Sequence, residues 1–105
     1  MHGVPEQLKS LCDAGDLCIV AFLRFDEQHE ARVGALKTMA KKYEGSSIKF
    51  FWLERGSDID CENALRISYL KNPVIAFAGS ENNFVTMQTE LSANALQDFV
   101  YYTQI

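Results

Sequence analysis

The stretch LCIVAFLRFDEQHEARVGALKTMAKKY, residues 17–43, joins a continuous apolar run to a long amphipathic segment. The run over residues 17–24 has β-branched residues at its centre and predicts a strand that is buried on both faces. Apolar residues then recur at helical spacing and predict a helix over residues 27–44. The apolar stripe of this helix is Val33, Leu36, Ala40 and Tyr43. A buried strand that leads directly into a long helix indicates an α/β fold.

Three further helices and three further strands are predicted along the rest of the chain. The helices are expected over residues 5–15, 57–67 and 91–103, and the strands over residues 47–54, 72–79 and 82–89. The link GSENN between the last two strands has hairpin length, so this pair is expected to be antiparallel. Helices separate the first three strands, which predicts parallel right-handed crossovers. The expected architecture is a central mixed β-sheet flanked by helices on both faces.

Length and composition limit the classes of protein that this chain can represent. A chain of 105 residues is long enough for one core and too short for two, so we expect one domain over residues 1–105. The net charge of −4 argues against nucleic acid as a partner, because phosphate backbones bind cationic surfaces. No apolar run approaches the roughly 18 residues of a membrane span, and the N-terminal residues lack a secretory signal. The chain is therefore expected to be cytosolic or to be a domain of a longer protein.

The chain has three cysteines. Five residues separate Cys12 from Cys18, a spacing that permits a local disulfide without proving one. Cys12 ends a predicted helix and Cys18 enters a buried strand, which favours a sealed structural bridge over a reactive redox pair. Such a bridge would stabilise the fold by ~2–3 kcal/mol. Cys61 lies among apolar helix positions and is predicted to be a buried free thiol.

The order of the elements, with Pro73 opening the third strand, resembles the thioredoxin fold. The closing helix has the capping Ser92 and the Leu/Phe spacing of the last thioredoxin helix. Three motifs in register are similar to the third, non-catalytic thioredoxin-like domain of protein disulfide-isomerases of the A6 type. These motifs are LCDAGDLCIVAFL, FWLERG and ENALRISYLKNP. The resemblance covers nearly the whole chain.

The junction between the first strand and its helix lacks the cysteines that the catalytic relatives carry there. A dithiol oxidoreductase needs a thiolate at a helix N-terminus and a second cysteine one turn later. Alignment from the strand places residues 27–30 at this position, and alignment from Tyr43 places residues 26–29 there; neither set contains a cysteine. Ala21 replaces the buried acid of the catalytic families. We therefore expect no catalytic residue, and no metal or cofactor site is predicted.

The resemblance implies a different role for the same region, as a surface that contacts polypeptide clients. The candidate client-binding residues are Asp26, Glu27, Gln28, His29, Asn72 and Pro73. Pro73 occupies the position of the cis-proline beside which clients dock in thioredoxin-like proteins, and the sequence leaves the isomer of the preceding bond open. A plainer interpretation is that Pro73 only orients a strand.

The acids of the junction also have a plainer interpretation, because acidic residues stabilise a helix start. Asp26 is expected to cap the helix, while Glu27 and Glu30 complement the helix dipole. No second ligand lies at metal spacing from His29, which argues against a metal site. His29 is therefore predicted to be an exposed residue in the first turn of the helix. Trp52 is predicted to lie in the core.

The resemblance implies a redox-inactive module of a longer protein disulfide-isomerase in the lumen of the endoplasmic reticulum. This domain would act as a scaffold in oxidative protein folding, and the enzyme would be the parent protein. Its expected partners are unfolded or partly folded polypeptides and other domains of the same chain. Two alternatives stay open: an unconventional thiol oxidoreductase that uses Cys12 and Cys18, and a cytosolic thioredoxin-like adaptor.

Overall fold

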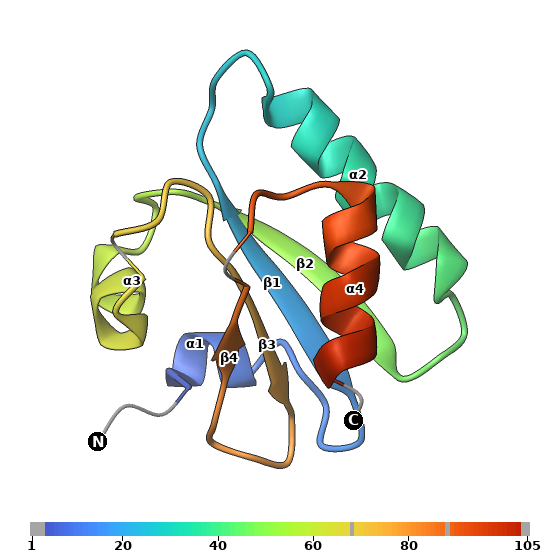
Figure 1. The fold of residues 1–105 in the computed structure, drawn as a ribbon. Coiled ribbons are helices and arrows are strands. Elements are labelled where there is room, and N and C mark those ends of the chain that lie inside the picture. Colours follow the sequence, from blue (N-terminus) through green and yellow to red (C-terminus); the bar gives the residue numbers. More distant parts are fainter. Residues whose placement is uncertain (1–3, 68, 88, 104–105) are drawn as a thin grey trace.

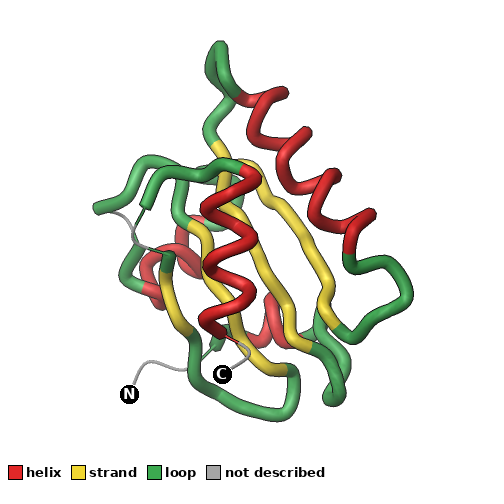
Figure 2. Tube along the Cα trace, turned by 45° about the vertical axis from the view of Figure 1, so that its right-hand side comes forward, coloured by secondary structure: helices red, strands yellow, loops and turns green. Residues whose placement is uncertain are grey.

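Four strands form one mixed sheet in the computed structural model, which describes residues 4–67, 69–87 and 89–103. The strand order is β2-β1-β3-β4. Helices α2 and α4 cover one face of this sheet, and α1 and α3 cover the other (Figure 1, Figure 2). The elements in chain order are α1 (Glu6–Lys9), β1 (Leu17–Leu23), α2 (His29–Lys42), β2 (Ile48–Glu54), α3 (Ile59–Leu65), β3 (Val74–Ala78), β4 (Val85–Thr86) and α4 (Ala93–Thr103). No helix among these combines the length and hydropathy that crossing a membrane requires.

Strand β1 lies at the centre of the sheet and is buried on both faces, as the sequence predicts. It pairs in parallel with β2 and antiparallel with β3. Its side chains alternate between two apolar clusters, one on each face of the sheet. Because neither face of β1 meets water, a continuous apolar run is the pattern that this position requires.

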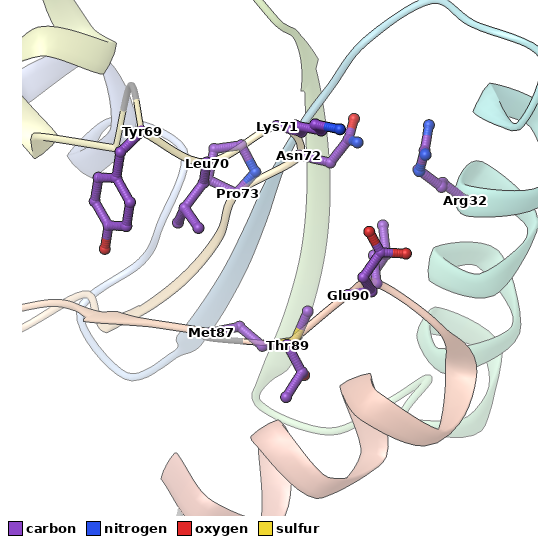
Figure 3. A pocket seen from close by; sticks show the side chains of 10 residues that line it. Arg32, Tyr69, Leu70, Lys71, Asn72, Pro73, Met87, Thr89 and Glu90 are labelled. Atoms are coloured by element: carbon purple, nitrogen blue, oxygen red, sulfur yellow. The ribbon is translucent and has the colours of Figure 1, made fainter.

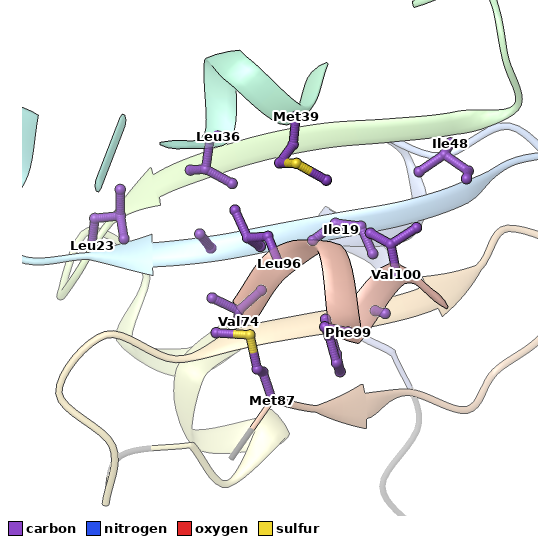
Figure 4. Packing of buried hydrophobic residues seen from close by; sticks show 12 residues of the cluster. Ile19, Leu23, Leu36, Met39, Ile48, Val74, Met87, Leu96, Phe99 and Val100 are labelled. Carbon is purple, nitrogen blue, oxygen red and sulfur yellow. The ribbon is translucent and has the colours of Figure 1, made fainter. Parts of the chain in front are cut away.

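The apolar cluster under α2 and α4 is the larger of the two (Figure 4). Helix α4 contributes Leu96, Phe99 and Val100, as expected from their spacing. Helix α2 contributes Leu36 and Met39, whereas Ala40 of the predicted stripe is exposed. The opposite cluster packs α1 and α3 against the other face of β1 and β3; it includes Leu8, Cys12, Cys18, Phe22, Cys61, Leu65, Ile75 and Phe77.

The direction of β3 corrects the prediction of three parallel strands. Strand β3 runs antiparallel to β1, with Val74 paired to Ala21 near the carboxyl end of β1. Helix α2 has 14 residues and spans about 21 Å, enough to return the chain along β1. Helix α3 has seven residues and spans about 10 Å, less than half the ~23 Å of β2. The chain therefore enters β3 at the end of the sheet where it left β2. The hairpin of β3 and β4 is antiparallel, as predicted.

Helix α1 and strand β4 are less than half as long as their sequence patterns predict. Helix α1 ends at Lys9, and the chain turns so that residues 12–16 pass beneath the end of β3. Strand β4 has only two residues. Asn82, the first residue of the predicted strand, lies outside β4 and accepts a hydrogen bond from the main-chain N–H of Val4. The predicted range of β4 also includes residue 88, which lies outside the described residues.

Gly79 provides the close approach between the loop that ends near Asp16 and the end of β3. Its N–H donates to the carbonyl oxygen of Asp16 over 2.9 Å. A Cβ atom at this position would lie 1.9 Å from the carbonyl oxygen of Asp13, which is a main-chain atom and cannot rotate away.

We therefore expect Gly79→Ala to lower the free energy of unfolding by about 2–3 kcal/mol, through overpacking against the backbone. The matched control is Gly34→Ala, because a Cβ there meets nothing within 4 Å and the residue lies inside α2. This control should raise the free energy of unfolding by about 0.5–1 kcal/mol. Urea denaturation measures both, and equal effects of the two substitutions would contradict the close approach at Gly79.

Candidate functional site

The carboxyl end of β1 gathers three segments that are distant in the sequence. The N–H of Phe22 donates to the carbonyl oxygen of Pro73 over 2.8 Å, and the N–H of Arg24 donates to Asn72 Oδ1 over 2.9 Å. On the other edge, the N–H of Arg55 donates to the carbonyl oxygen of Leu23 over 2.7 Å. These hydrogen bonds hold the start of β3 and the exit of β2 beside the junction between β1 and α2.

A groove of about 540 Å³ lies at this meeting point, and we call it the junction groove. It is lined by Arg24, Asp26, Glu27, Gln28, Arg32, Lys71, Asn72 and Glu90. The structure thus brings together four of the six candidate client-binding residues, and it places Asn72 opposite the junction. No lining residue of the junction groove is a cysteine.

Pro73 is buried and lines a separate cavity of about 240 Å³ beside the junction groove. Leu70, Met87 and Leu91 give this Pro73 cavity apolar walls, and Tyr69 stands at its side. Figure 3 shows Lys71 and Asn72 above the cavity, with Arg32 projecting from α2 and Glu90 from the segment before α4. The two spaces share Arg32, Lys71, Asn72 and Glu90 as lining residues.

The main chain at residues 71–72 is available for pairing. Within the described part of the chain, the N–H and C=O groups of Lys71 and Asn72 make no hydrogen bond. The same part of the chain contains no cis peptide bond, so the bond between Asn72 and Pro73 is trans. A trans bond is also the isomer that X–Pro bonds intrinsically prefer.

Asp26 organises the charges of the junction groove. Its Oδ1 accepts a hydrogen bond from the N–H of Gln28 over 2.9 Å and lies 2.7 Å from Arg32 Nη1. The Gln28 N–H and then the Arg32 guanidinium hold the pKa of the Asp26 carboxyl below its usual value. The prediction that Asp26 caps α2 is wrong, because the helix begins at His29 and Gln28 is its cap residue. Asp26 instead forms a turn just before the helix.

His29 does not line the junction groove, and the prediction that it is exposed is wrong. Only 8% of its surface is accessible. Its ring centroid lies 4.1 Å from that of Phe25 and 4.9 Å from that of Trp52, and its Nδ1 lies 3.2 Å from the carbonyl oxygen of Arg24. The turn at Asp26 delays the helix start, and His29 consequently becomes an inward-facing first residue.

Trp52 is 39% exposed, which corrects the prediction that it belongs to the core. Strand β2 is an edge strand, so Trp52 has no neighbouring strand on its outer side. Trp52 packs instead against His29 and, edge to face, against Phe25, whose ring centroid lies 6.3 Å away. Residues 25, 29 and 52 form an aromatic cluster outside the junction groove.

Cys12 and Cys18 lie at disulfide-bond distance, with Sγ atoms 2.02 Å apart and Cα atoms 6.0 Å apart. Both are buried in the cluster under α1 and α3. Cys18 is the second residue of β1, and the junction groove lies beyond Leu23 at its other end. Five residue steps along a strand cover about 16 Å, so this pair lies well away from the junction groove.

Cys61 is a buried free thiol, as predicted, with 1% of its surface accessible. Burial, and then the nearby carboxylates of Asp58 and Glu62, raise the pKa of Cys61 to about 11. Its N–H donates to Asp58 Oδ1 over 3.0 Å, so Asp58 caps the N-terminal end of α3. Ser92 caps α4 in the same way, by accepting from the N–H of Ala95.

An ion pair between the partly buried Arg55 and the buried Glu62 was not predicted from the sequence. Nη1 of Arg55 contacts Glu62 Oε1, and the N–H of Gly56 donates to Glu62 Oε2 over 2.7 Å. Nη2 of Arg55 donates to the carbonyl oxygen of Leu70 over 2.7 Å. The pair therefore ties β2 to α3 and to the segment that carries residues 71–72. The available signal was the presence of both residues in the motifs FWLERG and ENALRISYLKNP.

Comparison with known proteins identifies the fold. No family model matches the chain, and no curated protein matches it in sequence. Among solved structures, the chain is similar to a thioredoxin pre-protein of Schistosoma mansoni in its reduced form, with a TM-score of 0.55 and 18% sequence identity. The match covers 94% of this chain and 90% of that protein. The chain therefore has a thioredoxin-like fold, with a mixed four-stranded sheet and flanking helices.

We expect Cys61 to react with a thiol reagent only after unfolding. At pH 8 a thiol with a pKa of about 11 is roughly one part in a thousand thiolate, and burial also blocks the reagent. Mass spectrometry after alkylation, with and without urea, measures the protection. Rapid labelling of the native protein at Cys61 would contradict it.

The raised pKa of Cys61 further predicts that the free energy of unfolding falls as pH rises from about 9 towards 11, because the thiol ionises first in the unfolded chain. Cys61→Ser is the control for this pH dependence.

We expect Glu62→Gln to lower the free energy of unfolding by about 2–4 kcal/mol, because it leaves the Arg55 charge without its buried counter-ion. Glutamine keeps the shape and an acceptor for the Gly56 N–H, so the loss reports the charge. The control is Glu54→Gln, an exposed acid on β2 that should change stability by less than about 0.5 kcal/mol. Thermal and urea denaturation compare the two variants. A loss of stability no larger for Glu62→Gln than for Glu54→Gln would contradict a stabilising role for the Arg55–Glu62 ion pair.

Proposed function

We propose that this chain is a non-catalytic thioredoxin-like module that binds extended polypeptide in the junction groove. The observation that carries the proposal is that residues 26–28 lie across one groove from residues 71–72, whose main chain makes no hydrogen bond within the described residues. The same part of a catalytic thioredoxin-like protein holds its reactive dithiol. This chain keeps the groove and presents acidic and amide side chains where that dithiol would stand.

Thiol chemistry at the groove has no nucleophile to start it. A thiolate must be accessible and must reach the sulfur that it attacks. Cys61 is buried with a raised pKa, and the Cys12–Cys18 pair lies at the far end of β1. Binding without redox turnover is the function that these positions support.

Several features of the junction groove suit an extended peptide. A peptide strand can form main-chain hydrogen bonds with Lys71 and Asn72, which is the basis of strand-addition recognition. The adjoining Pro73 cavity, with the apolar walls of Leu70, Met87 and Leu91, offers a place for one apolar side chain. Cations and anions both line the junction groove, so its charge does not restrict binding to peptides of one sign.

The proposed setting is a protein disulfide-isomerase in the lumen of the endoplasmic reticulum. Two arguments support it: the three motifs shared with the non-catalytic domain of the A6 type, and a cysteine pair at disulfide-bond distance. Disulfides persist in oxidising compartments and are rare in the cytosol. In this setting the module would also contact other domains of its parent protein and space them.

Site-specific crosslinking tests the proposed binding site. A photoreactive residue placed at Gln28 or at Lys71 should crosslink to a reduced, carboxymethylated client protein that cannot refold. The same residue placed at Lys37, an exposed position on α2 outside the groove, should crosslink several-fold less. Equal crosslinking at all three positions, or none at Gln28 and Lys71, would refute client binding in the junction groove.

Two assays separate this proposal from its alternatives. Insulin reduction should proceed no faster with this chain than with the variant Cys12→Ala/Cys18→Ala, whereas a faster rate would favour an oxidoreductase that uses this pair. Thiol counting on protein isolated from its native compartment should give one free thiol and one bridge. Three free thiols would favour the cytosolic adaptor.

A further inference from the structure

A second groove lies between α4 and the strand segment that contains β4, and it has a volume of about 670 Å³. We call it the α4 groove. On one wall, Ala95, Phe99 and Tyr102 form a stripe along α4 at helical spacing. On the other wall, Val85 and Met87 follow the strand. Phe99 and Met87 are core residues (Figure 4), and they give the groove an apolar floor.

The apolar surface of the α4 groove extends to exposed side chains. Tyr102 is 67% exposed and Val85 is also exposed. The stripe from Ala95 to Tyr102 covers about 10 Å, which equals about three residues of extended chain. The dimensions and lining of the groove therefore suit the side chains of a short polypeptide segment.

The charges of the α4 groove all have one sign. Glu90 and Asp98 line it, and no lysine or arginine does. The junction groove differs, since Arg24, Arg32 and Lys71 balance its acids. An apolar surface bordered only by carboxylates attracts a partner that combines apolar side chains with positive charge.

We propose that the α4 groove binds an extended polypeptide segment in which an aliphatic or aromatic side chain is flanked by lysine or arginine. The apolar side chain lies against Phe99, Met87 and Tyr102, and the flanking cation meets Asp98. This site goes beyond the proposed function, because Asp98, Phe99 and Tyr102 of α4 line neither the junction groove nor the Pro73 cavity. It gives the module a second contact, selective for basic segments.

A second copy of the chain fits the α4 groove less well. Two copies repel each other, since each carries a net charge of −4. The clustered lysines of the chain, Lys37, Lys41 and Lys42, lie on α2. Pairing them with the α4 groove of another copy would join two different surfaces, and such a contact extends into open chains unless its rotation closes a ring.

Fluorescence anisotropy with two labelled peptides tests the proposal. One probe alternates leucine with lysine, and the other alternates leucine with glutamate. We expect saturable binding of the lysine peptide and affinity at least about tenfold lower for the glutamate peptide. Tyr102→Ser should weaken binding of the lysine peptide about 5- to 30-fold, through loss of an aromatic contact. Tyr101→Ser is the matched control, because Tyr101 is equally exposed and does not line the groove, so binding should stay unchanged.

A charge reversal supplies the second arm of the test. Asp98→Lys should weaken binding of the lysine peptide about two- to fivefold at low salt, and the effect should shrink as salt is added. Asp60→Lys changes the net charge equally from an exposed position on α3 and should have a smaller effect. Asp98 is preferable to Glu90 here, because Glu90 lines both grooves.

Three results would overturn the proposal. Equal losses from Tyr101→Ser and Tyr102→Ser would show unspecific binding. Loss of binding on Gln28→Trp, which blocks only the junction groove, would place the peptide there. Sedimentation that reveals a dimer broken by Tyr102→Ser would assign the α4 groove to a second copy.

Discussion

The structure depends on one strand that is buried on both faces and hydrogen-bonded on both edges. β1 contributes side chains to both apolar clusters. Main-chain groups at its carboxyl end form the hydrogen bonds that fix the start of β3 and the exit of β2. A buried main-chain group without a partner is costly, so these bonds leave little freedom in where the segments meet. The junction groove is the consequence, since residues 24–28 emerge where residues 71–72 are already held.

The same strand separates the Cys12–Cys18 pair from the junction groove. The Cys12–Cys18 pair lies at the amino end of β1, and the residues that line the junction groove lie at its carboxyl end. At the groove, Asp26 lies in the turn before α2. The Gln28 N–H and the Arg32 guanidinium stabilise its ionised carboxylate. The thioredoxin-like fold therefore carries the Asp26–Arg32 ion pair at this end of β1.

Local patterns predict the parts of this fold that local physics determines. The buried run of β1, the inward face of α4 and the cap at Ser92 follow from residue type and spacing alone. That residues 26–30 contain no cysteine is read directly from the sequence. Asn72 was a site candidate from the resemblance, and the structure places it in the junction groove with Asp26.

The features that sequence reasoning missed depend on contacts between distant residues. The antiparallel direction of β3 follows from the shortness of α3 relative to β2. His29 is buried because the turn at Asp26 shifts the helix start, and Trp52 is exposed because β2 has only one neighbouring strand. The ion pair of Arg55 with Glu62 joins two elements, and no periodicity within either element reports it.

Amide hydrogen exchange, measured with and without a client protein that cannot fold, tests the central claim most directly. The amides of residues 18–24 should exchange slowly in both conditions, because they are bonded within the sheet or to Asn72. The amides of Lys71 and Asn72 should exchange rapidly in the free protein and become protected when the client binds. Client binding that leaves Lys71 and Asn72 unprotected, or rapid exchange along β1 itself, would contradict a rigid scaffold that binds polypeptide at this groove.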